Sequence, residues 1–500
     1  MAEPSRDLLD MYIIGGGING TGIANDAAGR GLTVGLCEQG DLAGATSSAS
    51  SKLIHGGLRY LEHHEFRLVG EALRERETLL NKAPHIIWPL RFILPHRSHL
   101  RPAWMIRAGL FLYDHLGKRK QLPGSRGVRF GSDSPLKPEI MRGFEYSDCW
   151  VDDARLVVLN AIQAREGGAE ILVRTRCTAA YEEQGHWCIE LQDQRTGKRL
   201  RRYARTLVNA AGPWVESVIR EQTRRRSRYA IRMIQGSHLI VPRLNADDRA
   251  YILQNSDRRI VFVLPYEDDF SLVGTTDRRY EGDPARVAIA EEEVDYLLEV
   301  VNENFRRQLT RSDVISSFSG VRPLCDDESD DPSAMTRDYT LAFDEQGAPL
   351  LSVFGGKITT YRKLAESALE MLAPRFPHMG RPWTATVALP GGDIANQVNF
   401  SHQLLETYPW LGDDRARRFA RSYGTLCLRF LSGATEEADL GEAFGAGLTA
   451  AEVDYLIDHE WATSTEDILW RRTKLGLRLT PRQLDALVQH VEAHCQVLAA

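Results

Sequence analysis

Three glycines near the start of the chain, Gly15, Gly17 and Gly20, have the spacing that binds the pyrophosphate of a dinucleotide. In a G-x-G-x-x-G pattern the first glycine makes a tight turn, the second lets the backbone approach the phosphates, and the third lets the helix pack on the strand. The phosphates lie at a helix N-terminus, where unpaired N–H groups and the helix dipole favour anions. Glu38 follows the second predicted strand, at a position where a carboxylate can bind both hydroxyls of a ribose. The pattern predicts a bound dinucleotide; the alternative is a glycine turn without a ligand.

A second glycine pair, Gly355-Gly356, favours a flavin over a nicotinamide cofactor. A nicotinamide enzyme places its first βαβ unit beside further strands with regular crossovers. Here the alternation breaks after Glu38, and a strand followed by glycine returns only at Gly212 and at Gly355-Gly356. A helix that begins near Lys357 could stabilise negative charge on a reduced flavin ring. For this pair alone, an ordinary strand–helix turn is an equally good interpretation, but together the widely spaced patterns predict FAD.

These residues require strands that end at each glycine pattern and helices that begin there. The apolar run 10–14 predicts a strand, 18–30 a helix and 32–37 a second strand, which together form a βαβ unit. Apolar residues at helical spacing predict a helix over 66–80. We further expect strands within 170–191 and at 207–212, 237–242, 259–265, 270–275 and 350–354, and helices at 289–306 and throughout 398–500.

The composition indicates an ordinary globular protein of several domains. Of 500 residues, 43% are hydrophobic and 26% charged, and 62 Lys and Arg against 68 Asp and Glu give a net charge of −6. That charge gives no support to nucleic-acid binding, and no apolar run approaches the roughly 18 residues of a membrane-spanning helix. The first residues lack the apolar segment of a signal peptide. We therefore expect a cytoplasmic protein.

Neither the cysteines nor the acidic residues indicate a metal site. The seven cysteines are odd in number and contain no C-x-x-C spacing, which argues against a disulfide framework and a structural zinc site. The acidic run 326–331 has no helix-spaced His/Glu pair beside it, so a solvated loop is the better interpretation. We predict no bound metal.

Five segments resemble the FAD-dependent glycerol-3-phosphate dehydrogenases, in particular the bacterial aerobic, respiratory type. Residues 14–31, which contain the first glycine pattern, and residues 355–365 match the two signatures of that family. The other three similar segments are 51–62, with its His-Gly-Gly-Leu-Arg-Tyr stretch, 236–238 and 319–330. The resemblance covers nearly the whole chain, including its helical C-terminal part.

The resemblance implies an α/β plus α+β fold in three units. A Rossmann-like FAD-binding domain of the glutathione-reductase and D-amino-acid-oxidase type would be discontinuous, comprising residues 1–80, 150–225 and 315–388. A substrate-binding β-sheet domain, 81–149 and 226–314, would be inserted in it. An all-helical C-terminal domain, 389–500, would follow.

The resemblance also implies a reaction: oxidation of sn-glycerol 3-phosphate to dihydroxyacetone phosphate by hydride transfer to FAD, with the electrons passed to membrane ubiquinone. Arg59, Arg322 and Lys357 are the cations expected to bind the phosphate, and Tyr60 is expected to donate a hydrogen bond to it. For a single arginine the alternative is a structural ion pair. Each of these residues, however, lies in a motif loop that contains glycine or proline.

His55 and His238 are the two candidates for the general base, because imidazole can titrate near working pH. His55 could contact the flavin instead, and His238 is equally well interpreted as a core histidine. We expect the remaining FAD contacts at Gly15, Gly17, Gly20, Glu38, Thr46, Ser47, Ser48, Ser51, Lys52, Leu53, Gly212, Gly356, Lys357 and Thr359.

Residues 91–130 form a basic, aromatic segment that contains a predicted amphipathic helix. The segment has nine Lys or Arg residues and one acid, and Trp104, Ala108, Phe111 and His115 share a helical face with Leu100. Such a helix can lie on an anionic membrane; the alternative is a helix that covers the core. The resemblance favours the membrane, because ubiquinone is found there. We therefore expect a peripheral protein on the inner face of the cytoplasmic membrane.

Other activities and the oligomeric state are also considered. The alternatives are a glycerol-3-phosphate oxidase that reduces oxygen to hydrogen peroxide, an amino-acid oxidase of the same superfamily, and a flavin-binding sensor without catalysis. Three cations near the substrate favour a phosphate over a carboxylate. We expect a homodimer.

Overall fold

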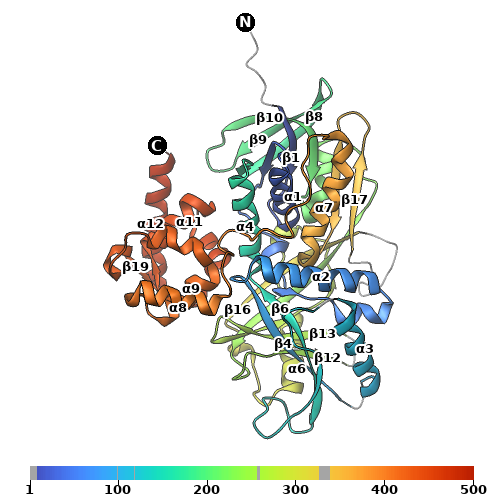
Figure 1. The fold of residues 1–500 in the computed structure, drawn as a ribbon, viewed down its shortest axis with the longest axis vertical. Helices are drawn as coiled ribbons and strands as arrows, with labels where there is room; N and C mark the ends of the chain where they lie inside the picture. The colour runs from blue at the N-terminus through green and yellow to red at the C-terminus, as the bar shows by residue number, and fades with distance from the viewer. Residues whose placement is uncertain (1–7, 98–99, 118, 256–258, 326–337, 500) are drawn as a thin grey trace.

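The computed structural model describes residues 8–97, 100–117, 119–255, 259–325 and 338–499. Within these residues, a mainly parallel sheet and a mainly antiparallel sheet follow one another along the long axis of the molecule, and a helical region lies beside their junction (Figure 1). The acidic run 326–331, predicted as a loop, lies outside the described residues.

The first sheet has β1 (Leu8–Ile14) at its centre, paired in parallel with β2 (Val34–Cys37) and β10 (Arg199–Asn209). Met11 and Ile13 are fully buried, as expected of parallel strands that are covered on both faces. The strand order is β17-β18-β10-β1-β2-β7, and β8 and β9 extend from β10. The remaining bounds are β7 (Glu170–Leu172), β8 (Thr175–Glu183), β9 (His186–Asp193), β17 (Tyr339–Asp344) and β18 (Leu350–Gly355).

Three helices share a core with this sheet: α1 (Ile18–Gly29), α4 (Asp153–Glu166) and α7 (Tyr361–Leu372). Small side chains on α1, such as Ala24 and Ala27, let it pack closely against its neighbours. The predicted βαβ unit at the start of the chain is therefore confirmed. The short helix α5 (Val215–Ser217) follows β10.

The second sheet has the order β15-β11-β14-β13-β12-β4-β6-β3, with β16 paired to β11 and β5 to β6. The predicted strands at 237–242, 259–265 and 270–275 are confirmed with small changes of their bounds. The bounds are β3 (Leu53–Ile54), β4 (Ile87–Pro95), β5 (Arg126–Arg129), β6 (Arg142–Val151), β11 (Ile231–Pro242), β12 (Ala250–Gln254), β13 (Ile260–Tyr266), β14 (Phe270–Gly274), β15 (Arg278–Arg279) and β16 (Ser316–Cys325).

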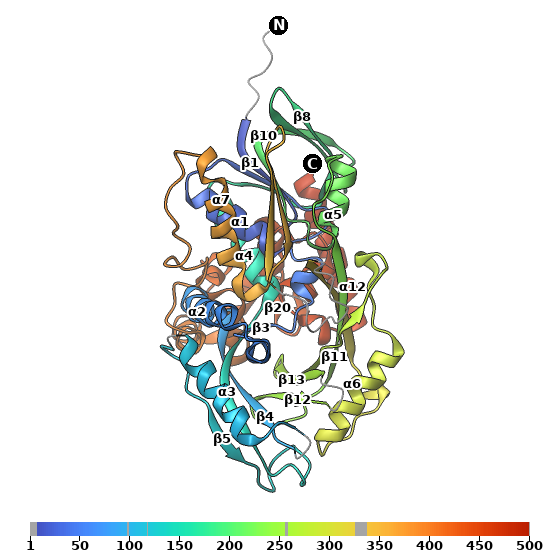
Figure 2. The ribbon, with the colours of Figure 1, turned by 90° about the vertical axis from the view of Figure 1, so that its right-hand side faces the viewer.

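Helices flank the second sheet on two sides. Figure 2 shows α2 (Phe66–Lys82) and α3 (Ala103–Leu116) on one side and α6 (Glu291–Asn304) on the other. The predicted helices over 66–80 and 289–306 are thus confirmed. No helix in the described part of the chain is long and apolar enough to cross a membrane.

The C-terminal region is helical except for one short hairpin. Its helices are α8 (Gln397–Thr407), α9 (Asp413–Ser422), α10 (Leu428–Leu431), α11 (Ala450–Glu460) and α12 (Pro481–Ala499). The hairpin, β19 (Ala443–Gly445) and β20 (Leu448–Thr449), was not predicted. Its strands are too short for hydrophobic periodicity to distinguish them from turns.

Buried ion pairs attach the C-terminal region to the rest of the molecule. Arg472 donates to both carboxylate oxygens of Asp41, at 2.8 and 2.9 Å, and neither side chain has appreciable exposure. Arg155 on α4 pairs with Glu460 at the end of α11 in the same manner. Removing one partner of such a pair leaves a buried charge without compensation, which is strongly destabilising. These two ion pairs therefore fix the C-terminal region against α4 and the residues that follow β2.

Candidate active site

The predicted glycine turn lies between β1 and α1. Gly15 has a φ of +116°, and a Cβ at Gly20 would lie 1.9 Å from the carbonyl oxygen of Gly15. Gly17 is the N-cap of α1 and carries no side-chain cap, and the N–H of Ile18 donates to the Ser47 hydroxyl at 3.0 Å. This close strand–helix packing leaves the helix N-terminus accessible to a phosphate group.

Glu38 follows β2 and lies beside this turn. One of its carboxylate oxygens accepts the N–H of Gly16 at 2.7 Å, and the other accepts the N–H of Gly40 at 2.8 Å. Burial raises the pKa of Glu38, and these two N–H donors act in the opposite direction. The carboxylate is thus held next to the glycine turn, where the sequence predicted a ribose contact.

The serine-rich loop leads from β2 in the first sheet to β3 in the second sheet. The loop contains a short 3-10 helix, Thr46–Ser48. The hydroxyl of Thr46 donates to the carbonyl of Val321 on β16 at 2.6 Å. The Ser47 contact with the start of α1 anchors the same loop at its other side. The predicted contacts Thr46, Ser47 and Ser48 therefore lie between the glycine turn and the strand that carries Arg322.

Two predicted FAD contacts direct their side chains to protein groups. The Lys52 ammonium group lies 2.7 Å from the carboxylate of Asp153 and also donates to the carbonyl of Ser48 at 3.1 Å. Leu53 is buried in β3 opposite Trp150. Both side chains hold the loop in place.

The second glycine turn meets the start of α1 and the His55 loop. The side-chain amide of Asn19 donates to the carbonyl of Gly355 at 3.1 Å. The N–H of His55 donates to the hydroxyl of Thr359 at 3.4 Å, and Thr359 lies in the 3-10 helix that precedes α7. Gly212 begins another 3-10 helix directly after β10. The predicted residues thus gather at the carboxyl ends of β1, β10 and β18, where ligands bind in such sheets.

These residues fit an FAD. The Oδ1 atom of Asn19, at the start of α1, is buried and has no hydrogen-bond partner among the described residues, as expected of an acceptor that faces a ligand with N–H or O–H donors. Three features match the three parts of the cofactor. The N-terminus of α1 suits the pyrophosphate, the Glu38 carboxylate suits the ribose, and the turn at Gly355-Gly356 suits the flavin end. Glu38 would hold the ribose and the start of α1 the pyrophosphate.

Arg322, a predicted phosphate ligand, lies on β16 beside β11. Its guanidinium group donates to the Thr275 hydroxyl at 3.0 Å and forms an ion pair with Asp277. About a quarter of its side chain is exposed, so it borders solvent. The sequence reasoning missed Thr275 and Asp277, because they follow β14 in a segment without a recognisable motif.

Lys357 and Tyr60 lie together. The Lys357 ammonium group is 3.8 Å from the centroid of the Tyr60 ring, a distance at which the ring quadrupole attracts a cation. Tyr60 and the half-buried Arg59 lie on the 3-10 helix Leu58–His63, before α2. The structure therefore brings two residues of the predicted substrate set into direct contact.

His238 on β11 is almost completely buried. Its ring stacks on Phe318 at a centroid distance of 4.8 Å, and its Nε2 atom lies 2.9 Å from the Ser51 hydroxyl. Its Nδ1 atom has no hydrogen-bond partner within the described ranges. Burial lowers the pKa of His238 to about 3, with smaller contributions from the positive charges of Arg322 and Lys52. The imidazole is therefore uncharged at neutral pH, next to the predicted flavin loop.

A buried polar network behind β11 was also missed. Glu293 on α6 accepts hydrogen bonds from the hydroxyls of Ser237 and Thr276, at 3.0 and 2.5 Å. Glu293 belongs to a run of three glutamates, 291–293, which on sequence alone suits an exposed first helical turn. This network holds Ser237, which precedes His238, and Thr276, which lies between the two partners of Arg322.

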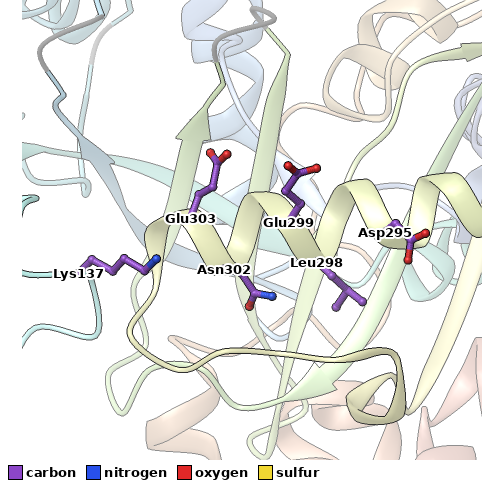
Figure 3. A pocket seen from close by; sticks show the side chains of 6 residues that line it. All are labelled: Lys137, Asp295, Leu298, Glu299, Asn302 and Glu303. Carbon is purple, nitrogen blue, oxygen red and sulfur yellow. The ribbon is translucent and has the colours of Figure 1, made fainter.

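One cavity among the described residues lies away from the predicted site. A cavity of about 430 Å³ along α6 is lined by Lys137, Asp295, Leu298, Glu299, Asn302 and Glu303 (Figure 3). Figure 3 shows three carboxylate groups and one amine around it. None of the predicted site residues contributes to it, and its acidic lining would repel a phosphate.

Comparisons with known proteins identify the family of the chain. The family model "FAD dependent oxidoreductase" matches residues 10–362, and the model "C-terminal domain of alpha-glycerophosphate oxidase" matches residues 382–498. The chain is 63% identical over 495 residues to a glycerol-3-phosphate dehydrogenase of Pseudomonas aeruginosa, covering 98% of this chain and 96% of that protein. It is 52% identical over 495 residues to a D-erythritol 1-phosphate dehydrogenase of Brucella abortus, covering 98% of each.

A solved structure extends the agreement to three dimensions. The glycerol-3-phosphate dehydrogenase of Bacillus halodurans, complexed with FAD, superimposes with a TM-score of 0.76 at 28% identity, covering 98% of this chain and 90% of that one. Fold, glycine turns and sequence identity lead to the same assignment. The chain belongs to the family of FAD-dependent glycerol-3-phosphate dehydrogenases.

Proposed function

We propose that this enzyme oxidises sn-glycerol 3-phosphate to dihydroxyacetone phosphate and passes the electrons to membrane ubiquinone. The observation that carries the proposal is the placement of three residues beside the flavin-binding turns: Arg322 on β16, which contacts the serine-rich loop, and Lys357 against Tyr60 at the second glycine turn. Relatives that match along nearly their whole length bear the name glycerol-3-phosphate dehydrogenase. When bound, FAD supplies the acceptor for the hydride, with its two electrons, that leaves C2 of the substrate.

Arg322, Arg59 and Lys357 bind the phosphate dianion in this proposal. The planar guanidinium of Arg322 can form two parallel hydrogen bonds to phosphate oxygens, and lysine adds a compact charge. Asp277 and Thr275 hold the Arg322 side chain in the free enzyme. The Tyr60 hydroxyl donates a hydrogen bond to the phosphate, and its ring positions the Lys357 ammonium group. Fixing the phosphate in this way orients C2 for reaction.

His238 accepts the proton of the C2 hydroxyl. Its Nδ1 atom lacks a partner among the described residues and its ring is uncharged, so it can accept a hydrogen bond. A bound phosphate dianion would offset the charge of Arg322, which is one of the causes of the low pKa of His238. Binding of substrate would therefore make His238 a better base. His55, whose backbone contacts Thr359, is assigned to the flavin side of the site.

The FAD contacts of the proposal are the predicted ones. Gly17 and Gly20 at the start of α1 hold the pyrophosphate and Glu38 the ribose. The backbone near Gly212 and from Gly356 to Thr359 lies along the flavin end. The serine-rich loop with Ser51, and Lys52 through its backbone, covers the cofactor.

D-erythritol 1-phosphate is the second candidate substrate, because a relative of 52% identity bears the name D-erythritol 1-phosphate dehydrogenase. Both compounds offer a phosphate at one end and a hydroxyl group next to the phosphorylated carbon. An anaerobic titration distinguishes them: the flavin spectrum should bleach with sn-glycerol 3-phosphate at concentrations at which D-erythritol 1-phosphate and glycerol leave it oxidised. Bleaching by D-erythritol 1-phosphate alone would reassign the substrate, and no bleaching by either would favour a sensor.

Ubiquinone is proposed as the acceptor because α3 presents an apolar face to solvent. The exposed fractions of Trp104 and Phe111 are 70% and 62%, while Leu110 and Tyr113 on the other face are buried. Arg107 on the same helix is also exposed. Aromatic residues with nearby cations favour binding to an anionic membrane surface. Faster reduction of a soluble quinone than of oxygen, without accumulation of peroxide, is the expected result; the reverse would indicate an oxidase.

We also propose the domain division and the dimer. The FAD domain comprises 1–80, 150–225 and 315–388, the substrate domain 81–149 and 226–314, and the C-terminal domain 389–500. The first sheet draws its strands only from the FAD-domain ranges, which supports this division, although β3 and β16 pair in the second sheet. The proposed homodimer should elute with twice the chain mass of 56.2 kDa in light scattering coupled to gel filtration.

A further inference from the structure

Two histidines and two aspartates face one another between α11 and α12. The Nε2 atom of His490 lies 2.7 Å from Oδ1 of Asp454, and the Nδ1 atom of His494 lies 3.1 Å from the same oxygen. The Nε2 atom of His494 lies 2.9 Å from Oδ1 of Asp458. Each pair is spaced i, i+4 on its helix, so its side chains share one helical face.

We propose that Asp454, His490 and His494 form a binding site for a divalent transition metal, with Zn²⁺ as the ion that fits best. One ligand atom from each of the three residues lies within 4.8 Å of the others. Zinc bonds of about 2.0 to 2.2 Å in a tetrahedral arrangement require ligand atoms roughly 3.3 Å apart. The 2.7 and 3.1 Å separations from Asp454 need only small side-chain movements to reach this value.

The ligand chemistry favours zinc over magnesium or calcium. Imidazole nitrogen is a ligand for zinc, copper and nickel, whereas the alkaline-earth ions prefer sites made entirely of oxygen. Two histidines four residues apart on a helix are a recurrent zinc-binding arrangement. The side chains of Asp454, His490 and His494 are between 24% and 35% exposed, so water can occupy the fourth position.

Asp458 completes the site from outside the ligand set. With a metal at the Nδ1 atom of His494, the N–H at Nε2 would donate to the Asp458 carboxylate. A carboxylate that accepts the second N–H of a ligand histidine fixes the tautomer and orientation of the ring. The bound ion would tie the last helix of the chain to α11, away from the flavin site.

The absence of a bound metal was predicted from the cysteines and from the acidic run 326–331 alone. His490 and His494 have the spacing that would have raised the question, but their aspartate partners lie on another helix, 36 positions away in each pair. The site is independent of the proposed reaction, because none of its residues contacts a predicted FAD or substrate residue in the described interactions.

Calorimetric titration of the full-length, FAD-loaded protein, treated with EDTA and desalted, tests the proposal. ZnCl2 should bind with one tight site per chain, and MgCl2 should not. The double variant His490→Gln/His494→Gln should lose this site, while His402→Gln, an exposed histidine on α8, should keep it. X-ray absorption at the zinc edge should show imidazole ligands in the wild type.

Asp458→Asn provides a second, milder variant that leaves the three ligands intact. Replacing the charged carboxylate by a neutral amide weakens the hydrogen bond to the ligand histidine and should weaken zinc binding by about 10- to 100-fold. The proposal is wrong if the wild type binds no zinc, if the double variant binds it as tightly as the wild type, or if magnesium binds equally well.

Discussion

The hydroxyl of Ser51 lies 2.9 Å from Nε2 of His238. Ser51 ends the serine-rich loop that covers the start of α1, and His238 lies on β11 of the second sheet. This contact joins the flavin-binding loop to the strand that carries the proposed base. The other ring nitrogen of His238, Nδ1, has no hydrogen-bond partner among the described residues.

Replacing His238 tests its role as the base. His238→Asn should lower kcat by about 10²- to 10⁴-fold, the usual range for a lost general base, with little change of KM. Stopped-flow reduction of the flavin by sn-glycerol 3-phosphate from pH 6 to 9 measures this directly. His459→Asn, at an exposed position, is the control. If His238→Asn reduces its flavin as fast as the wild type across this pH range, His238 is not the base and serves only in the core.

Arg322 should be essential for affinity. Arg322→Ala removes a charged hydrogen-bond donor, and such interactions contribute about 1.5 to 3 kcal/mol, so KM should rise roughly 10- to 100-fold. Inhibition by inorganic phosphate should weaken by a similar factor. Arg311→Ala removes an exposed ion pair on the surface of α6 and should change neither value. An unchanged KM in Arg322→Ala would exclude Arg322 from phosphate binding.

A methyl group at Gly20 should prevent FAD binding. The added Cβ would lie 1.9 Å from the carbonyl oxygen of Gly15, so α1 could not pack on β1. Gly109→Ala on α3 is a matched control, since a Cβ there meets nothing within 4 Å. The flavin-to-protein absorbance ratio after purification should fall to near zero for Gly20→Ala and stay at the wild-type value for Gly109→Ala. A fully loaded Gly20→Ala protein would contradict the assignment.

The exposed face of α3 should bind vesicles. The double variant Trp104→Ser/Phe111→Ser should lose most of its flotation with vesicles that contain anionic lipid, and wild-type flotation should decrease as salt is added. Val398→Ser removes a side chain of similar exposure, 58%, from α8 and should float like the wild type. Equal flotation of the two variants would place the membrane contact elsewhere.

Two buried histidines should make the protein sensitive to mild acid. Burial lowers the pKa of His85 and of His238 to about 3, against 6.5 for a free histidine. Between these values the unfolded chain binds more protons than the folded chain, so stability decreases as pH falls below 6.5. At pH 5 each histidine should lower the free energy of unfolding by about 2 kcal/mol relative to pH 8.

The comparison of His85→Leu with the wild type isolates one of these contributions. The thermal midpoint should fall less between pH 8 and pH 5 in His85→Leu, while His402→Leu should behave like the wild type. Parallel pH dependences in His85→Leu and the wild type would mean that His85 does not resist protonation in the folded state.

Local patterns predicted the first glycine turn and the carboxylate that lies beside it. Gly15, Gly17, Gly20 and Glu38 lie within one βαβ unit, so their spacing in the sequence determines their spacing in space. The same argument held for the turn at Gly355. Each of these residues could be found because strand, turn and helix follow one another directly.

Contacts between strands that are far apart in the sequence could not be predicted in this way. Asp277 reaches Arg322 only because β11 pairs with β16 on one side and β14 and β15 on the other. Glu293 is buried by that same packing, although its own neighbours in the sequence are charged. Hydrophobic periodicity predicts strands but not which strands pair with one another. The partners of the proposed catalytic residues could therefore be identified only from the structure.

The buried pairs Arg472–Asp41 and Arg155–Glu460 have a consequence for protein synthesis. On the ribosome, Asp41 and Arg155 emerge hundreds of residues before their partners. Until Glu460 and Arg472 leave the exit tunnel, the N-terminal part cannot bury these two charges at low cost. We therefore expect the flavin site to mature only after Arg472 has left the exit tunnel, which makes the nascent chain a substrate for chaperones and leaves chains truncated before this residue open to proteases.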